Sequence, residues 1–311
     1  MPGGDPPLEC PLYVTCMTAT APAASRPVWH TLMPPLFVLL WASGFVVTKL
    51  GVSFAEPFYF LLIRFVVTTG LLLAVALATR APWPPGWRAG AHIAVVGVLL
   101  QAVYLGGVYA AIFAGIPAGV SALVVGLQPL LTAVVVGPLL GERVGGRQWL
   151  GLALGFVGVF LVLWQKLNVD AGHLGGLAWN ILGLVGITAA TLYQKRFCAG
   201  MDWRTGGVIQ YAAGALAVAP LALALETGHI IWTRNLFIAY GWLIFVLSIG
   251  AVSLFGWLIR RGAASRVASL FYLVPPSAAL MGWFLFGETL GPLALLGLAV
   301  TVGGVALANK R

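Results

Sequence analysis

Long, continuous runs of apolar residues dominate the chain, and short links separate them. Ten runs come close to the roughly 20 residues that a helix needs to cross the hydrocarbon core of a bilayer. They lie near residues 33–52, 57–78, 90–112, 117–138, 146–163, 174–194, 205–224, 236–257, 263–285 and 290–308. The runs do not alternate between apolar and polar residues, which favours helices over a membrane β-barrel. The pattern predicts an all-α integral membrane protein with ten transmembrane helices.

Composition supports this class. The 311 residues are 60% hydrophobic and only 8% charged, which leaves too few polar side chains to cover a soluble protein of this size. No link after residue 30 is long enough to fold as a domain, and Cys10, Cys16 and Cys198 lack the spacing of a metal site. We therefore expect no soluble catalytic domain, no catalytic residues, no metal and no cofactor. Residues 1–32, rich in Pro, Gly, Ala and Thr, are predicted to be a disordered cytoplasmic tail.

The net charge of +9 raises the question of nucleic-acid binding, but the distribution of the basic residues argues against it. With ten spans and the N-terminus inside, thirteen basic residues fall on the cytoplasmic side, and only Lys166 and Arg234 face out. The positive-inside rule predicts such a bias. We expect a multi-pass protein of a bacterial inner membrane with both termini cytoplasmic and no nucleic-acid partner.

An internal repeat organises the ten runs. GPLLGERVGG at 137–146 is echoed by FLFGETLGP at 284–292, and a shift of 146 residues without a gap pairs Glu142 with Glu288 and Pro129 with Pro275. The chain is predicted to be a duplicated five-helix unit, with repeats at 33–163 and 174–308. Because five is odd, the second copy enters the membrane from the opposite side. Inverted repeats of this kind are typical of secondary transporters that work by alternating access.

Three stretches carry a resemblance to a known family. WASGFVVTKLG at 41–51, GLQPLLTAVVVGPLLGE at 126–142 and LVPPSAALMGWFLFGE at 273–288 resemble the EamA-type repeats of the drug/metabolite transporter superfamily, most closely its aromatic amino-acid exporters. The resemblance implies export of amino acids or related small metabolites. GITAATLYQKRF at 186–197 departs from the usual tryptophan-containing start of the repeat.

Polar and aromatic residues inside the spans are candidates for a substrate cavity. In lipid such groups must face protein or water. The residues predicted to line the cavity are Trp41, Phe45, Gln101, Tyr104, Gln128, Thr191, Ser269 and Tyr272. Ordinary hydrogen bonds between helices are the alternative, and they are favoured for the Ser and Thr residues. Pro129 and Pro275 are predicted hinges, with static kinks as the alternative.

Charged residues near the ends of spans have two interpretations. Glu142 and Glu288 are expected to stabilise tight turns at helix N-termini, with a gating or coupling role as the alternative. Lys49 and Arg64 are expected to reach the outer headgroups or pair with Glu56, with attraction of a substrate carboxylate as the alternative.

The sequence thus predicts a secondary transporter, functional as a monomer in the lipid bilayer, that exports a small-molecule substrate, amino acids by preference. A multidrug or nucleotide-sugar type carrier is the alternative within transporters. A membrane-embedded enzyme or a channel is a weaker alternative, because no nucleophile constellation is visible and a channel would not explain an inverted repeat.

The charge bias generates a test of orientation. Single cysteines at Arg88 and Arg196, in a background without native cysteines, should be shielded from an impermeant thiol reagent in intact cells. A cysteine at Gly228 should react. Labelling at position 196 from outside would contradict the inverted repeat.

Overall fold

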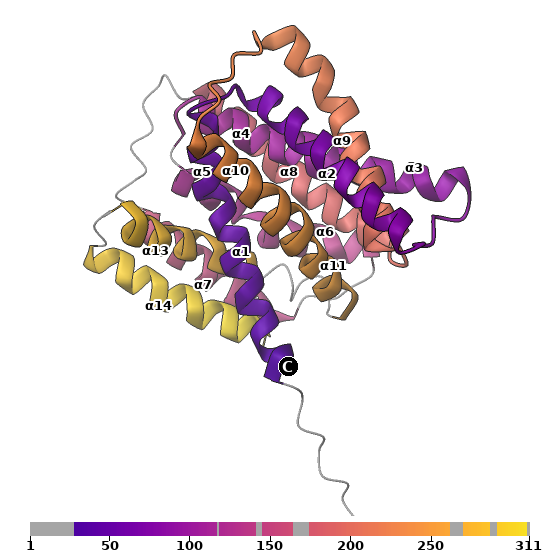
Figure 1. The fold of residues 1–311 in the computed structure, drawn as a ribbon. Helices are drawn as coiled ribbons and strands as arrows, with labels where there is room; N and C mark the ends of the chain where they lie inside the picture. Colours follow the sequence, from indigo (N-terminus) through magenta and orange to yellow (C-terminus); the bar gives the residue numbers. More distant parts are fainter. Residues whose placement is uncertain are drawn as a thin grey trace, which may run out of the picture.

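The fold is helical throughout the described part of the chain. The computed structural model describes residues 28–116, 118–140, 145–163, 174–261, 270–286 and 291–309. Figure 1 shows the helices in chain order; their bounds are α1 Val28–Val52, α2 Pro57–Ala78, α3 Gly86–Gly97, η1 Val98–Leu105, α4 Gly106–Phe113, α5 Ala118–Val125, α6 Gln128–Leu140, α7 Gly146–Leu163, α8 Leu174–Phe197, α9 Trp203–Leu225, α10 Arg234–Gly241, η4 Trp242–Ala251, α11 Val252–Arg261, η5 Leu270–Leu273, α13 Val274–Phe286 and α14 Pro292–Asn309. Glu142, Glu288, Ser269 and residues 1–27 of the predicted tail lie outside the described residues.

Six helical stretches are long and apolar enough to cross a membrane: 32–52, 57–78, 86–113, 174–197, 203–225 and 234–258. α7 and α14 contain shorter apolar stretches. These findings confirm the all-helical class, and α2 and α7 have the bounds that the apolar runs predict. α1 begins at Val28 rather than near residue 33, because the helix continues through Pro34 and Pro35 to include the apolar residues before them.

Four of the predicted runs are not uniform α-helices. The fourth run ends its first helix at Val125, turns at residues 126–127 and restarts at Gln128. Among the residues described, the ninth begins with the 3₁₀ turn η5 and continues as α13. The third run contains the π-helix η1, and the eighth contains a second π-helix, η4. Pro129 and Pro275 each occupy the second position of a helix, where a missing N–H is tolerated.

α2 and α9 pack antiparallel, and hydrogen bonds join them where α2 begins and α9 ends. The Glu226 carboxylate, just beyond α9, accepts hydrogen bonds from the backbone N–H groups of Phe58 and Tyr59, both at 2.8 Å. These groups belong to the first turn of α2, where helical N–H groups lack internal partners and a negative charge is favoured. Glu226 therefore caps α2 from another part of the chain. Burial raises the pKa of this carboxyl group above its ordinary value.

A second carboxylate, which precedes α2, joins the same two segments in the opposite direction. Glu56 accepts hydrogen bonds from the backbone N–H groups of Thr227 (3.0 Å) and His229 (2.9 Å). Partial desolvation raises the pKa of Glu56, but the hydrogen bonds from Thr227 and His229 outweigh it and bring the pKa below the ordinary value. We call the reciprocal pair Glu56 and Glu226 the carboxylate latch. It corrects the expectation that Glu56 pairs with Lys49 or Arg64.

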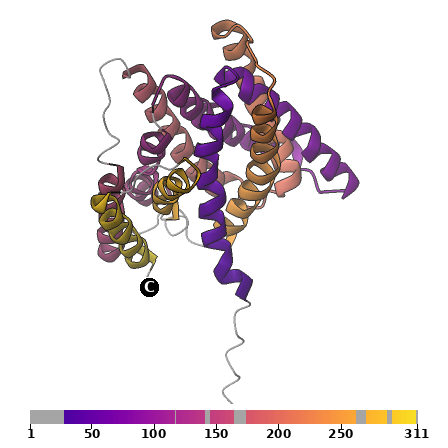
Figure 2. The same cartoon turned by 60° about the vertical axis from the view of Figure 1, so that its left-hand side comes forward.

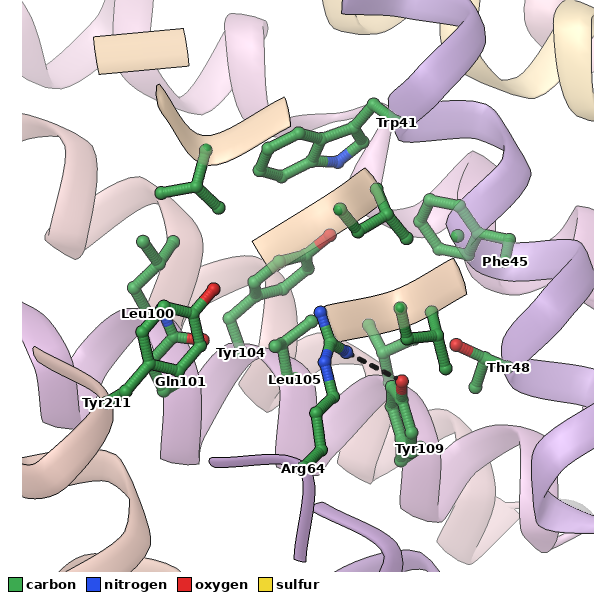
Figure 3. A pocket seen from close by; sticks show the side chains of 15 residues that line it. Trp41, Phe45, Thr48, Arg64, Leu100, Gln101, Tyr104, Leu105, Tyr109 and Tyr211 are labelled. Carbon is green, nitrogen blue, oxygen red and sulfur yellow. Dashed lines mark hydrogen bonds between the residues drawn. The ribbon is translucent and has the colours of Figure 1, made fainter. Parts of the chain in front are cut away.

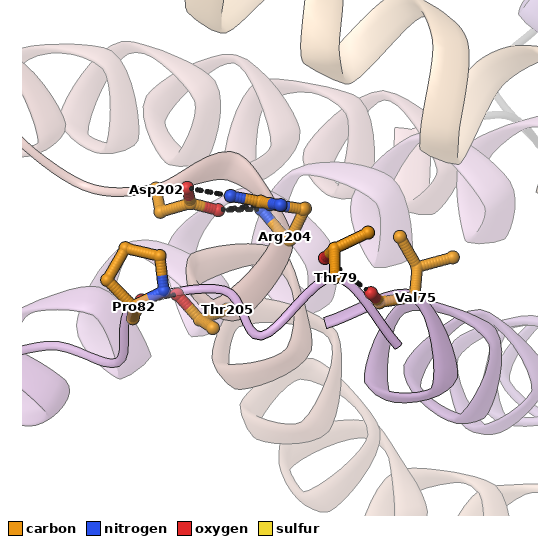
Figure 4. A network of polar contacts seen from close by, with 6 residues as sticks. All are labelled: Val75, Thr79, Pro82, Asp202, Arg204 and Thr205. Atoms are coloured by element: carbon orange, nitrogen blue, oxygen red, sulfur yellow. Dashed lines mark hydrogen bonds and ion pairs between the residues drawn. The ribbon is translucent and has the colours of Figure 1, made fainter. Parts of the chain in front are cut away.

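Figure 4 shows the polar contacts at the opposite end of the same helix pair. Asp202 caps α9 by accepting from the backbone N–H of Arg204 at 2.8 Å, and it also forms an ion pair with the Arg204 side chain. The hydrogen bond from Arg204 lowers the pKa of Asp202. Across the helix pair, the Thr205 hydroxyl donates to the carbonyl oxygen of Pro82 at 2.8 Å. Here the acidic side chain bonds within its own segment rather than across to α2.

α7 and α14 form a tightly packed pair at one side of the molecule, where Figures 1 and 2 show them side by side. A Cβ atom built on Gly304 would lie 2.5 Å from the backbone nitrogen of Gly155 and 2.7 Å from the carbonyl oxygen of Gly151. Small residues that allow backbones to approach in this way are a common basis of helix pairing in membranes.

Two neighbouring glycines of α14 provide a matched test of this packing. Gly304→Ala should lower the thermal unfolding temperature, because overpacking of a tight contact costs about 1–3 kcal/mol. Gly303→Ala should be neutral or stabilising, because a Cβ there has no neighbour within 4 Å and Ala favours helix. Equal melting temperatures for the two purified variants in detergent would contradict the contact.

Candidate functional site

A cavity of about 50 Å³ lies within the bundle formed by α1, α2, η1, α4, α9, η4 and α11. Figure 3 shows side chains from these helices converging on it. Its aromatic lining comes from Trp41 and Phe45 of α1 and three tyrosines. The full lining is Trp41, Gly44, Phe45, Thr48, Arg64, Leu100, Gln101, Tyr104, Leu105, Val108, Tyr109, Tyr211, Leu243, Leu247 and Val252. Such a pocket, largely apolar with a few convergent polar groups, is typical of small-molecule sites.

The two π-helices supply much of this lining. η1 contributes Gln101 and Tyr104, and η4 contributes Leu243 and Leu247. An i→i+5 turn shifts the direction of the side chains that follow it, and such turns are frequent at functional sites. The cavity therefore lies where the third and eighth runs depart from regular α-helix.

Arg64 is the one charged group in the cavity lining. Its side chain is 4% exposed. Nη1 donates to the hydroxyl oxygen of Tyr109 at 2.8 Å, the bond drawn in Figure 3. Nε and Nη2 donate to the hydroxyl oxygen of Ser248, at 3.1 and 3.0 Å. A buried guanidinium thus links α2, α4 and η4 through neutral oxygen atoms.

None of the three carboxylates in the described part of the chain pairs with Arg64. Glu56 and Glu226 form the carboxylate latch, and Asp202 pairs with Arg204. The expectation that Arg64 reaches the outer headgroups is wrong. It follows Pro57 by seven residues, which places it about 10 Å along α2 at 1.5 Å per residue, and its side chain points into the protein.

The cavity brings together four of the predicted site residues: Trp41, Phe45, Gln101 and Tyr104. Thr191 is buried and donates to the carbonyl oxygen of Ile187 in its own helix. Gln128 and Tyr272 are fully buried but do not line this cavity. The Tyr272 ring packs against Gly155 and occupies the space that a side chain at that position would need.

Several buried polar atoms have no hydrogen-bond partner among the described residues. Gln101 has an unpaired Nε2 within the cavity lining. Both amide atoms of Gln128 and the Tyr272 hydroxyl are also unpaired, near the helix breaks at Pro129 and Pro275. Unpaired buried polar atoms cost about 1–3 kcal/mol each, so a bound ligand or water that satisfies them gains that much. Gln101 is therefore the predicted site residue with the clearest capacity to bind a ligand.

A second cavity, of about 350 Å³, adjoins the first. Leu100, Tyr211 and Val252 line both. The second cavity extends to Lys195 and Trp203, at the connection between α8 and α9. The second cavity therefore lies between the central cavity and the end of the bundle opposite the carboxylate latch.

Tyr109, Tyr211 and Ser248 are site residues that the sequence did not single out, and a substrate role for Arg64 was only the alternative to a position at the outer headgroups. For Arg64 a signal existed: a charge two turns inside an apolar run is costly unless it faces protein or water. The remaining three lack such a signal, because isolated Tyr and Ser residues are common in membrane helices. Among the described residues, no group of His, Cys, Asp and Glu could hold a metal ion.

Comparison with known proteins identifies the family. The model of the EamA-like transporter family matches residues 32–164 and again residues 174–310. The chain therefore belongs to the EamA-like transporter family. It is a multi-pass membrane protein and a transporter rather than an enzyme, which confirms the class predicted from the sequence.

Relatives agree with this assignment. The chain is 30% identical over 273 residues to the "Uncharacterized inner membrane transporter YedA" of Escherichia coli K12, covering 86% of this chain and 87% of YedA. It is 27% identical to a "Probable terminal-alkyne amino-acid exporter" of Streptantibioticus cattleyicolor, covering 92% and 94% of the two chains. A solved structure described as "Crystal structure of protein" matches with a TM-score of 0.74 at 20% identity, covering 91% of this chain and 98% of that one, and supports the fold.

Gln101 provides a test of the cavity. Gln101→Leu should reduce transport, because a polar contact to substrate worth about 1–3 kcal/mol is lost. Its melting temperature should not fall, because the substitution removes an unpaired buried amide. Flux in proteoliposomes and scanning fluorimetry measure the two effects. Gln128→Leu is the comparison outside the cavity; a loss of transport in that variant alone would move the site to the helix breaks.

Proposed function

We propose that this EamA-like transporter exports amino acids or related small metabolites across a bacterial inner membrane by alternating access. The observation that carries the proposal is the central cavity, which combines an aromatic and aliphatic lining with a buried guanidinium and an unpaired amide. A relative named as a probable terminal-alkyne amino-acid exporter and another named a "Probable amino-acid metabolite efflux pump", from Escherichia coli K12, support amino acids as the substrate class.

Ten spans in two inverted repeats, 33–163 and 174–308, form the proposed architecture. The two π-helices support it, because η1 shifted by 146 residues falls on 244–251, inside η4. The carboxylates that precede α2 and α9 support it too, since Glu56 shifted by 146 is Asp202. Two separate matches of one family model add sequence evidence.

The arrangement of the cavities supports a state that is open to the cytoplasm. In the proposed orientation, which the distribution of basic residues supports, the α8–α9 connection lies inside and the carboxylate latch outside. The second cavity leads towards that connection, whereas the latch joins α2 and α9 at the opposite end. In the alternate state the outer end would open and the cytoplasmic end would close. The latch would then be broken, and the contact between Thr205 and Pro82 would be strengthened. Pro129 and Pro275, at the two helix breaks, are the proposed hinges.

Transport is proposed to follow the substrate gradient or to proceed by exchange. A proton-coupled carrier needs a titratable group that both sides can reach in turn. The described carboxylates Glu56, Asp202 and Glu226 all lie beyond helix ends. The multidrug alternative is less favoured, because cationic drugs would meet the positive charge of Arg64. We propose that the monomer is the functional unit.

Counterflow tests the proposal. Proteoliposomes loaded with unlabelled L-phenylalanine should take up labelled L-phenylalanine faster than empty ones, and an imposed pH gradient at zero membrane potential should not change the initial rate. Valine and cysteine should be tested in the same way. Absence of counterflow with every amino acid would contradict the substrate class. Accumulation driven by the proton gradient alone would instead require a coupling residue and would contradict the exchange mechanism.

A further inference from the structure

We infer that Arg64 binds the carboxylate of the substrate and that the site takes small apolar carboxylates whether or not they carry an amino group. The inference rests on the proposed function, because it treats the central cavity as the transport site. It makes the carboxylate essential for recognition and leaves the ammonium group of an amino acid dispensable.

The hydrogen bonds of Arg64 leave room for a carboxylate. A guanidinium has five N–H groups. Three of them donate within the described chain, from Nε, Nη1 and Nη2, to Ser248 and Tyr109. One N–H therefore remains on each terminal nitrogen. Two donors on adjacent nitrogens match the two oxygens of a carboxylate, the bidentate pairing that makes arginine effective at such sites.

Charge balance points to an anion. A guanidinium stays protonated at physiological pH, and a buried charge with only neutral partners is costly. The described carboxylates are engaged elsewhere, in the latch and with Arg204. A monoanionic ligand would neutralise Arg64. A zwitterion would add an ammonium group, and the cavity lining contains no acidic side chain to pair with it.

The remaining lining defines the body of the ligand. The lining combines Trp41 and Phe45 of α1 with Leu243 and Leu247 of η4, which suits an aromatic or branched aliphatic group. A phosphate ester is less suitable, because its second negative charge would have no counter-charge in this lining. Gln101, with its unpaired Nε2, supplies a further donor for an anionic oxygen.

Four probes that share a phenyl ring separate these possibilities: 3-phenylpropionate, L-phenylalanine, phenethylamine and phenyl phosphate. Affinities would be measured by isothermal titration calorimetry on the purified full-length chain in detergent. We expect 3-phenylpropionate to bind at least as tightly as L-phenylalanine. Phenethylamine and phenyl phosphate should bind about tenfold more weakly or worse, since a hydrogen-bonded charge pair is lost or a charge is left unpaired.

Variants then assign the preference to Arg64. Arg64→Met should reduce 3-phenylpropionate binding by about tenfold or more and abolish the preference for the carboxylate over the amine. Arg64→Lys should keep the preference with lower affinity. Lys49→Met, which removes an exposed charge at the end of α1, should bind all four probes as the wild type does. A purely structural role of Arg64 would weaken every probe alike.

Several results would overturn the inference: equal binding of phenethylamine and 3-phenylpropionate by the wild type, a retained carboxylate preference in Arg64→Met, tighter binding of phenyl phosphate, or no binding of any probe. The relative affinities of the four probes for the wild-type protein test the inference even if a variant does not fold. Binding is measured without transport, so Arg64-dependent binding of 3-phenylpropionate together with absent amino-acid counterflow would leave this inference intact and reject amino-acid export.

Discussion

The structure depends on how the buried charge of Arg64, the one buried charged side chain among the described residues, is accommodated in an apolar bundle. The hydrogen bonds of Arg64 to Tyr109 and Ser248 hold α2, α4 and η4 around the same point. Neutral oxygens offset only part of the cost of taking a guanidinium out of water. The cavity beside the charge leaves room for a water molecule or an anion that offsets the remaining cost. Because the charge is fixed within the fold, the cavity has a constant positive sign for any molecule that enters.

Much of the architecture follows from the sequence alone. Long apolar runs leave the backbone no alternative to helix in lipid, so the bounds of α2 and α7 could be predicted to the residue. The interruption before Gln128 was indicated by Pro129, which cannot donate a hydrogen bond within a helix. Two π-helices had no such signal, since their sequences read as ordinary apolar helix.

The residues of the site were only partly predictable from the sequence. Trp41, Phe45, Gln101 and Tyr104 were identified because polar and aromatic groups in a span need a protein or water neighbour. Hydrophobic periodicity did not show which face of α2 turns inward, because apart from Thr68 and Thr69 the residues around Arg64 are apolar on every side of the helix. The packing of α2 against α9 and η4 settles that question, and it is a property of the assembled bundle.

The carboxylate latch has a kinetic consequence. Two copies of one repeat that remained alike would give a carrier with equal preference for its two faces. Glu226 has no acidic counterpart in the first copy, where position 80 is an arginine, so the two ends of the α2–α9 pair differ in strength. Under the proposed alternating access, a carrier with this imbalance would rest mainly in one orientation. Its half-saturation concentration would then be lower on the side to which it rests open, and opening to the other side would require the latch to break.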